Sequence, residues 1–269
     1  MGVESICLRE AAHLVKRSPK YWHLVGKLYL EGLANPHSAK VFRAAYFFCR
    51  HIDDVLDGDR SVTVNPEAYV RDILSAVENG HQGPPIVELY KFAIGPIKEM
   101  ATETDDPKSY FIRVIKDAML FDFERAKERR VLTRDEIEQY YDDTFTPVTN
   151  IALIIAGSQQ RIRDVPEMVT TQGHIYTIRD LTRDLEQGII NVPSEELQEA
   201  GLNGKHLSYD VVRRNPVLSS WMDNEVERYS GELKVAREKL SDAASRKVCF
   251  PLIWQMNTYC KLYQLGLHK

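Results

Sequence analysis

The sequence lacks the features of zinc-ribbon, disulfide-rich, secreted and membrane-spanning proteins. Its 269 residues contain four cysteines, and no two of them form the close C-x-x-C pair typical of a metal ribbon. The apolar runs, such as residues 151–156, are far shorter than the roughly 18 residues that a membrane span needs. The first residues do not follow a signal-peptide pattern. We therefore expect a cytoplasmic protein with reduced cysteines and no transmembrane segment, and we leave peripheral membrane contact open.

An excess of basic charge is also missing. Lys and Arg number 35 against 39 Asp and Glu, which gives a formal net charge of −4. Proteins that bind nucleic acid neutralise phosphates with an excess of Lys and Arg, so we expect no nucleic-acid partner. The hydrophobic fraction of 43% and the charged fraction of 28% are ordinary for a globular protein. The length fits a single domain over residues 1–269.

Alternating patterns that would indicate β-strands are absent, whereas apolar residues recur at helical spacing along most of the chain. Four Asn-Pro or Asp-Pro pairs provide a capping side chain before a proline that can begin a helix. The sequence therefore predicts an all-α fold without a sheet. The ten predicted helices cover residues 4–16, 20–32, 37–57, 66–79, 86–102, 108–130, 134–157, 165–187, 216–241 and 244–266. Pro147 and Pro251 fall inside two of these helices and are expected to kink or break them.

Acidic residues are concentrated at the end of the helix that precedes Gly58. Tyr46, Arg50, Asp53 and Asp57 are spaced four, three and four residues apart, so they share one face of that helix. A carboxylate near a helix C-terminus opposes the helix dipole and costs about 0.3–1 kcal/mol. Helix stability does not favour this arrangement, which indicates a functional reason for it.

The helix that precedes Gly188 repeats the arrangement. Asp180 and Asp184 are again four residues apart, and Arg179 and Arg183 accompany them. The alternative to a functional site is that both helix faces are exposed to solvent, with their aspartates balanced by nearby arginines. This explanation suits a single acidic cluster more easily than two similar ones. If the two carboxylate pairs face each other, divalent cations must offset their repulsion. Mg²⁺ prefers hard oxygen ligands and is usually completed by substrate phosphate, so we expect a diphosphate substrate held by the neighbouring arginines.

Both segments resemble the aspartate-rich motifs of the squalene/phytoene synthase family. The first is YFFCRHIDDVLD at residues 46–57, and the second is RDLTRDLEQGIINVPSEEL at residues 179–197. The stretch FDFERAKERRVLTRDEIEQYYDD at residues 121–143 is similar too, and the resemblance extends from about residue 15 to residue 265. It implies an all-α class I isoprenoid synthase fold with a central cavity between helices, Mg²⁺ as the cofactor and an allylic isoprenyl diphosphate as the donor.

The resemblance also implies roles for single residues. The expected catalytic Mg²⁺ ligands are Asp53, Asp57, Asp180 and Asp184. The expected substrate-binding residues are Tyr46, Arg50, Tyr176, Arg179 and Arg183. Phe48 and Ile151 could line a prenyl pocket, although a core position is the more ordinary interpretation of Phe48. We assign no role to His51 or His174, because a single histidine beside a motif is more often structural.

The sequence departs from the family pattern at several places. Members that join two prenyl diphosphates carry a tyrosine where this chain has Asp142. Gly173 and Tyr176 stand where the family usually has Gln and Asn that serve the metal and the diphosphate. The stretch KRSPKYW at residues 16–22 replaces a His-Ser-x-Ser-Phe pattern. The chain stops ten residues after Tyr259, so we expect the last basic helix of the family to be absent.

These departures favour one diphosphate in the cavity over two. Two diphosphates bring about six negative charges and one brings about three, and unpaired charge is very unfavourable in a site of low dielectric constant. We hypothesise transfer of the prenyl group to an aromatic acceptor without a diphosphate, as in the family branch that prenylates carbazoles in bacterial secondary metabolism. Asp142 could then be a general base or a solvated helix-start residue. Head-to-head condensation is the main alternative, and a terpene cyclase and a non-catalytic scaffold are weaker ones.

Overall fold

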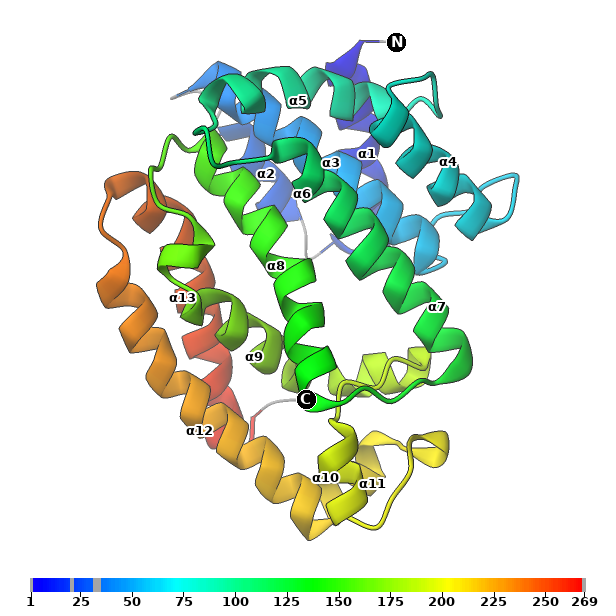
Figure 1. The fold of residues 1–269 in the computed structure, drawn as a ribbon, viewed down its shortest axis with the longest axis vertical. Helices are drawn as coiled ribbons and strands as arrows, with labels where there is room; N and C mark the ends of the chain where they lie inside the picture. Colours follow the sequence, from blue (N-terminus) through cyan, green and yellow to red (C-terminus); the bar gives the residue numbers. More distant parts are fainter. Residues whose placement is uncertain (1, 20–21, 31–34, 268–269) are drawn as a thin grey trace. The chain divides into compact units, whose positions relative to one another are not determined.

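The computed structural model describes residues 2–19, 22–30 and 35–267, and Figure 1 shows that they form α-helices joined by short connections. The longer helices are α1 (Val3–Arg17), α2 (Trp22–Leu30), α3 (Pro36–Leu56), α4 (Pro66–Asn79), α5 (Val87–Met100), α8 (Arg134–Ile155), α9 (Glu167–Gln187), α12 (Pro216–Lys239) and α13 (Ala243–Gln264). In the described ranges the β-structure amounts to an isolated bridge between Val131 and Ile190. The all-α prediction is confirmed. Within the same ranges, none of the helices is both long enough and apolar enough to cross a bilayer.

Most predicted helix boundaries agree with the structure to within two residues, and the differences have physical causes. The helix predicted over residues 108–130 is divided into α6 (Pro107–Arg113), a π-helix η3 (Val114–Leu120) and α7 (Phe121–Glu128). Two short helices, α10 (Ser194–Glu199) and α11 (Tyr209–Arg214), were not predicted, because fewer than two turns are too short to show helical periodicity. Residues 20–21 and 31–32 of the helix predicted over 20–32 lie outside the described residues.

Neither of the two prolines that we expected to kink or break a helix breaks it. Pro147 lies within α8 and Pro251 lies within α13, and both helices continue past them. The structure shows no break at either proline, and a kink at these positions stays a prediction. A proline removes one backbone donor from the helix, and the turns on either side keep their own hydrogen bonds and side-chain packing.

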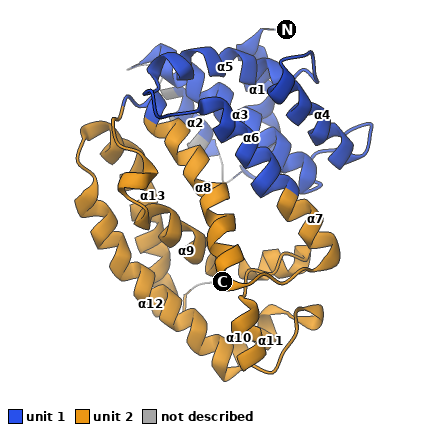
Figure 2. Ribbon diagram, in the orientation of Figure 1, with its two compact units in different colours: residues 1–120, 154–157 blue, residues 121–153, 158–269 orange. Residues whose placement is uncertain are grey.

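The described chain is organised as two compact units, which Figure 2 colours separately and which we describe one at a time. Unit 1 comprises Met1–Leu120 together with Ile154–Gly157. Unit 2 comprises Phe121–Leu153 and Ser158–Lys269. The first aspartate-rich motif belongs to unit 1 and the second to unit 2. The expectation of a single domain stays a prediction.

Helix α3 is the central element of unit 1, where it packs against α1, α4, α5 and η3. The apolar face opposite its polar residues is fully buried, as the exposed fraction of 0% at Val41, Phe48 and Ile52 shows. The Phe48 ring lies 5.6 Å from the ring of Tyr90 and 5.7 Å from that of Phe111, measured between centroids. Phe48 is therefore a core residue that fixes the rotation of α3.

Helix α9 has the corresponding place in unit 2, where it packs against α12 and α13. His174 of α9 is buried and pairs with two carboxylates, at 2.7 Å from Glu138 of α8 and in a shorter contact with Glu225 of α12. Its ring stacks on Tyr229 with 4.1 Å between centroids. Burial opposes protonation, but hydrogen bonds and charge from both glutamates raise the pKa of His174 above its ordinary value. His174 thus fixes α9 against two neighbouring helices.

The C-terminal end of α9 is held by a close approach of α7. Gly188 has φ +88°, and a Cβ atom at this position would lie 2.5 Å from the backbone oxygen of Ala126. Arg129, which follows α7, donates a hydrogen bond of 3.0 Å to the carbonyl oxygen of Leu185. The helix end that carries Asp184 therefore depends on a residue without a side chain.

Replacement of this glycine tests that dependence. Gly188→Ala should lower the free energy of unfolding by about 2–4 kcal/mol, because the left-handed backbone and the contact with Ala126 both oppose a Cβ atom. Gly231→Ala is the matched control, since Gly231 lies inside α12 with no atom within 4 Å of its added Cβ. It should stabilise by about 0.5–1 kcal/mol. Urea denaturation measures both values, and a loss below about 0.5 kcal/mol at Gly188 would contradict the interpretation.

Candidate active site

The first aspartate-rich motif occupies about the last three turns of α3. Arg50 donates a hydrogen bond of 2.6 Å from Nη1 to Oδ2 of Asp53, whose side chain is 35% exposed. Asp57 is exposed and forms the C-cap, with its backbone N–H 2.9 Å from the carbonyl oxygen of Asp53. Tyr46 lies two turns earlier, half-buried, with its ring centroid 5.3 Å from that of Phe47. The motif thus presents its carboxylates at one end of unit 1.

Asp54 differs from its neighbours because its side chain is buried. Its carboxylate lies 2.6 Å from Nη1 of Arg17 and 2.8 Å from Nε of Arg50. Arg17 also contacts Asp59 at 2.5 Å, so it ties the end of α1 to both sides of the helix end. Sequence reasoning did not select Arg17 as a site residue. The only signal was its position in the KRSPKYW stretch, which departs from the family pattern.

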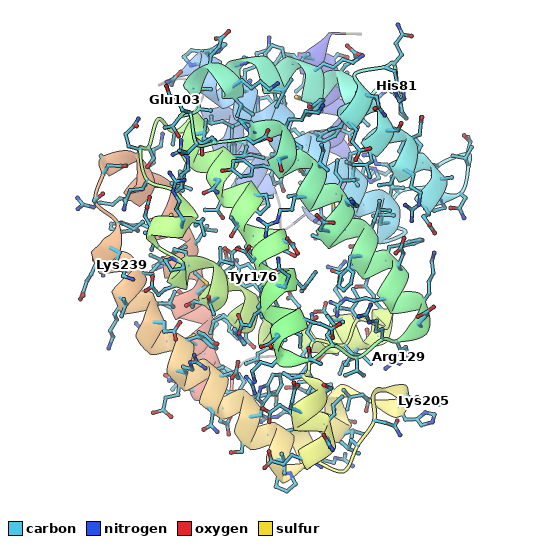
Figure 3. All side chains as sticks on the ribbon, in the orientation of Figure 1. His81, Glu103, Arg129, Tyr176, Lys205 and Lys239 are labelled. Atoms are coloured by element: carbon cyan, nitrogen blue, oxygen red, sulfur yellow. The ribbon has the colours of Figure 1, made fainter. Side chains whose placement is uncertain are left out.

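The aspartates of the second motif lie on the last turns of α9. Arg179 binds Asp180 through two hydrogen bonds, Nε to Oδ1 at 2.8 Å and Nη2 to Oδ2 at 2.5 Å. The guanidinium carbon of Arg179 lies 3.8 Å from the centroid of the Tyr176 ring, and the Tyr176 hydroxyl donates to Gln255 of α13 at 3.2 Å. Figure 3 labels Tyr176 on α9. Arg183, the remaining arginine of the motif, is exposed.

Asp184 is the most strongly perturbed carboxyl group of the motif. Burial, the charge of Asp180 and the charge of Asp122 raise the pKa of Asp184 to about 7, although Arg125 and Arg183 act in the opposite direction. The Asn191 side chain donates to Asp184 Oδ2 at 3.2 Å. This end of α9 therefore concentrates more negative charge than the neighbouring arginines offset.

A buried network that the sequence did not predict supports Asp184. Arg125 of α7 is buried and donates from Nε to Asp122 Oδ1 at 2.6 Å and from Nη2 to Asn191 Oδ1 at 2.6 Å. Tyr140 of α8 donates a short hydrogen bond to the other oxygen of Asp122. Because Asn191 in turn binds Asp184, the network connects α7 and α8 to the end of α9. Asp122 and Asn191 lie in stretches that carry the family resemblance, but nothing in the spacing indicated that they meet.

Gly173, one of the departures from the pattern that the resemblance implies, packs directly against Tyr141. A Cβ atom at Gly173 would lie 2.2 Å from the ring of Tyr141, so the tyrosine of α8 occupies the space that a side chain at position 173 would need. The Tyr141 hydroxyl is 2.5 Å from Thr177 Oγ1. Asp142, the next residue, lies inside α8 and not at its start, is half-buried, and accepts a hydrogen bond of 2.5 Å from Thr146.

The described residues offer oxygen ligands for a metal but no complete protein cage. Within residues 2–19, 22–30 and 35–267, no three His, Cys, Asp or Glu side chains converge on one point. Mg²⁺ commonly takes one or two carboxylates and completes its coordination with water and substrate phosphate. In unit 1 the partly exposed carboxylate of Asp53 is an oxygen ligand of the type that such an ion takes, and in unit 2 the same holds for Asp180.

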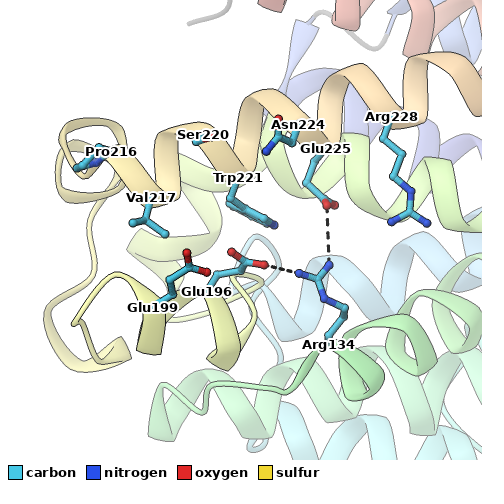
Figure 4. A pocket seen from close by; sticks show the side chains of 10 residues that line it. All are labelled: Arg134, Glu196, Glu199, Pro216, Val217, Ser220, Trp221, Asn224, Glu225 and Arg228. Atoms are coloured by element: carbon cyan, nitrogen blue, oxygen red, sulfur yellow. Dashed lines mark hydrogen bonds and ion pairs between the residues drawn. The ribbon is translucent and has the colours of Figure 1, made fainter.

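A separate cavity of about 790 Å³ lies in unit 2 along one face of α12 (Figure 4). Arg134 bridges its two walls, since it pairs with Glu196 of α10 and approaches Glu225 of α12 to 3.8 Å. None of the predicted site residues lines this cavity. It is therefore not the place where the second aspartate-rich motif would bind a diphosphate.

Comparison with known families identifies the chain. The sequence profile described as squalene/phytoene synthase matches residues 32–264, which is most of the protein. The chain belongs to the squalene/phytoene synthase family. A search of curated protein sequences and a search of solved structures each gave no significant match. Squalene/phytoene synthases transfer prenyl groups from prenyl diphosphates and bind Mg²⁺ through diphosphate-binding aspartates, so membership supports an enzyme of isoprenoid biosynthesis.

The pKa of Asp184 leads to a test of stability against pH. A carboxyl group whose pKa is higher in the folded protein than in the unfolded chain stabilises the fold at low pH and loses that contribution as pH rises through the folded value. Between pH 4 and about pH 7, the free energy of unfolding should therefore fall as Asp184 ionises in the folded protein. Asp184→Asn removes this charge, so without Mg²⁺ the variant should melt at a higher temperature than the wild type at pH 8 and at a similar temperature at pH 4.

Thermal denaturation across this pH range, with EDTA present, measures the difference. The raised pKa of His174 also makes the wild type less stable as pH rises, but that contribution is common to both proteins and cancels in the comparison. An Asn variant that melts below the wild type at pH 8 would show that Asp184 is not an unfavourable charge.

Proposed function

We propose that the protein is a Mg²⁺-dependent prenyltransferase that ionises one allylic isoprenyl diphosphate and transfers the prenyl group to a small aromatic acceptor without a diphosphate. A carbazole-like ring is the kind of acceptor we favour. Family membership supports the prenyl diphosphate chemistry. The choice of acceptor depends on the positions at which this chain departs from the family pattern.

The packing of Tyr141 onto Gly173 is the observation that carries the proposal. Where the family pattern has a glutamine that serves the metal and the diphosphate, this chain has no room for any side chain. The asparagine of the pattern is replaced by Tyr176, whose hydroxyl donates to Gln255. A second diphosphate would add about three negative charges, and leaving them without ligands in a desolvated site is very unfavourable. The aspartates and arginines that this chain keeps can therefore accommodate the negative charge of one diphosphate, but not that of two.

In each unit, the aspartates of its own motif would hold Mg²⁺. In unit 1 the ligands would be Asp53 and Asp57, and in unit 2 they would be Asp180 and Asp184, all of which present carboxylate oxygens of the type that Mg²⁺ prefers. When bound, Mg²⁺ would supply positive charge that stabilises the departing diphosphate. The surplus negative charge around Asp184 supports this assignment.

The arginines of the motifs would hold the diphosphate itself. Arg50 and Arg179 bind Asp53 and Asp180 in this structure. A guanidinium carries five N–H donors, so each can keep its aspartate and still donate to diphosphate oxygens. The ring of Tyr176 orients Arg179 from one face. Tyr46 and Arg183 would add further donors in the two motifs.

Transfer to an aromatic ring requires a base. The bond from the first prenyl carbon to the diphosphate oxygen breaks, a bond from that carbon to the ring forms, and the ring loses a proton. Asp142 is our candidate acceptor for this proton, because it is half-buried on α8 and its orientation is fixed by Thr146. A tyrosine at this position would be almost fully protonated at neutral pH, since its ordinary pKa is near 10, so it could not readily accept the proton.

Incubation of the purified protein with Mg²⁺ and allylic diphosphates of increasing chain length, with and without aromatic acceptors, tests the function. We expect diphosphate release and product formation that require the aromatic acceptor. Asp53→Asn and Asp180→Asn should each lower kcat/KM by about a hundredfold or more, because charge stabilisation is a large part of such a reaction's catalysis. Asp72→Asn, at an exposed aspartate of α4, is the matched control and should leave turnover unchanged.

The head-to-head alternative predicts a different product. It is equally consistent with family membership and with four retained aspartates. A C–C coupled dimer of the donor, formed without any acceptor, would establish that alternative and refute the aromatic acceptor. Full activity of both Asn variants, with circular dichroism showing unchanged helix content, would refute the metal assignment in either case.

A further inference from the structure

The last helix, α13, carries large apolar side chains on its solvent-exposed surface. Trp254 is 71% exposed and Leu265 is 69% exposed, and Phe250 and Leu262 are exposed by 37% and 39%. Exposed aromatic and aliphatic side chains that occur singly need no explanation, but a contiguous group indicates an interaction surface.

Phe250 and Trp254 lie on a single face of α13, and Leu265, the C-cap residue directly after the helix, continues that face. Lys247, Phe250, Trp254, Lys261 and Leu265 fall within an arc of about 60° when successive residues are placed 100° apart. The opposite face is buried in unit 2 through Cys249, Ile253, Met256, Cys260 and Tyr263. The exposed face therefore combines apolar and cationic residues, and we call these five residues the α13 stripe.

The charge of this segment has one sign. Residues 243–267 contain three basic residues, Arg246, Lys247 and Lys261, and no acidic residue. Arg237 of the neighbouring α12 adds a further guanidinium, which lies 5.5 Å from the centroid of the Phe250 ring. The chain as a whole has a formal net charge of −4, so this local positive charge is a departure from the average of the protein.

We propose that the α13 stripe docks the protein on the surface of an anionic phospholipid bilayer. A helix with Trp, Phe and Leu on one side, flanked by lysines, lies in the plane of the interface with its apolar side chains among the headgroups and upper acyl chains. Lysine side chains can bury their methylene groups and keep the ammonium in contact with lipid phosphates. The indole of Trp254 suits this boundary, because it has an apolar body and a polar N–H.

Charge favours a bilayer over a second copy of the chain. A symmetric dimer through the α13 stripe would bring Lys247 and Lys261 of one copy close to those of the other, with no acidic residue of α13 to pair with them. An anionic lipid surface accepts the same lysines without repulsion.

Vesicle sedimentation tests the proposal with the full chain and needs neither substrate nor metal. We expect the protein to bind vesicles of phosphatidylcholine mixed with phosphatidylglycerol, and to bind pure phosphatidylcholine at least about tenfold more weakly. Trp254→Gln combined with Leu265→Gln should weaken binding to the mixed vesicles by about tenfold or more. Lys247→Gln with Lys261→Gln should remove most of the preference for phosphatidylglycerol.

Trp22→Gln is the matched control, because Trp22 of α2 is 67% exposed and does not belong to the α13 stripe. It should bind vesicles as the wild type does. Equal binding of the wild type and the Trp254/Leu265 variant would overturn the proposal. So would a dimer in light scattering that dissociates on Trp254→Gln, since the stripe would then be covered by a second copy. The vesicle assay does not measure catalysis, so a protein that fails to bind vesicles would not contradict the proposed function. A protein that binds vesicles but has no activity would not contradict the docking surface.

Discussion

Negative charge at the ends of two helices is the constraint on which the rest of this structure depends. Carboxylates at a helix C-terminus oppose the helix dipole, and both α3 and α9 end in such residues. Ion pairs offset part of this charge. Arg50 and Arg17 pair with aspartates at the end of α3, and Arg179 pairs with Asp180 at the end of α9. The remainder is carried by Asp184, whose raised pKa marks a charge that the folded protein alone does not offset. An enzyme that binds a cation and a diphosphate at this position has a reason to keep it.

The helical framework could be predicted from the sequence because its signals are local. Asparagine and aspartate before proline begin α3, α4, α6 and α12 as expected, and in each case the side-chain oxygen accepts a hydrogen bond from the first turn. Gly188 ends α9 with a positive φ, also as expected. The π-helix at Val114–Leu120 and the short α10 could not be predicted, because a change of hydrogen-bond register and a helix of fewer than two turns leave no trace in apolar periodicity.

In the candidate site too, contacts between residues close in sequence could be predicted, whereas contacts between distant residues could not. Spacing alone brings Arg50 next to Asp53 and keeps Asp180 and Asp184 on one side of α9, so these pairs follow from the sequence. The partners that hold the motifs in place come from distant parts of the chain, such as Arg17 at Asp54 and Arg125 at Asn191. Buried ion pairs and hydrogen bonds of this kind depend on tertiary packing, and a residue's type does not reveal its partner.

The contact between Tyr141 and Gly173 restricts the order in which this sequence can change. Any side chain added at position 173 meets the aromatic ring first, so it is tolerated only after position 141 has become smaller. The smaller residue alone would leave a cavity beside His174, whose ring now packs against the edge of Tyr141. A path back to the amide of the family pattern must therefore pass through a less stable intermediate sequence. This epistasis makes the departure at position 173 difficult to reverse by single substitutions, whatever acceptor the enzyme uses.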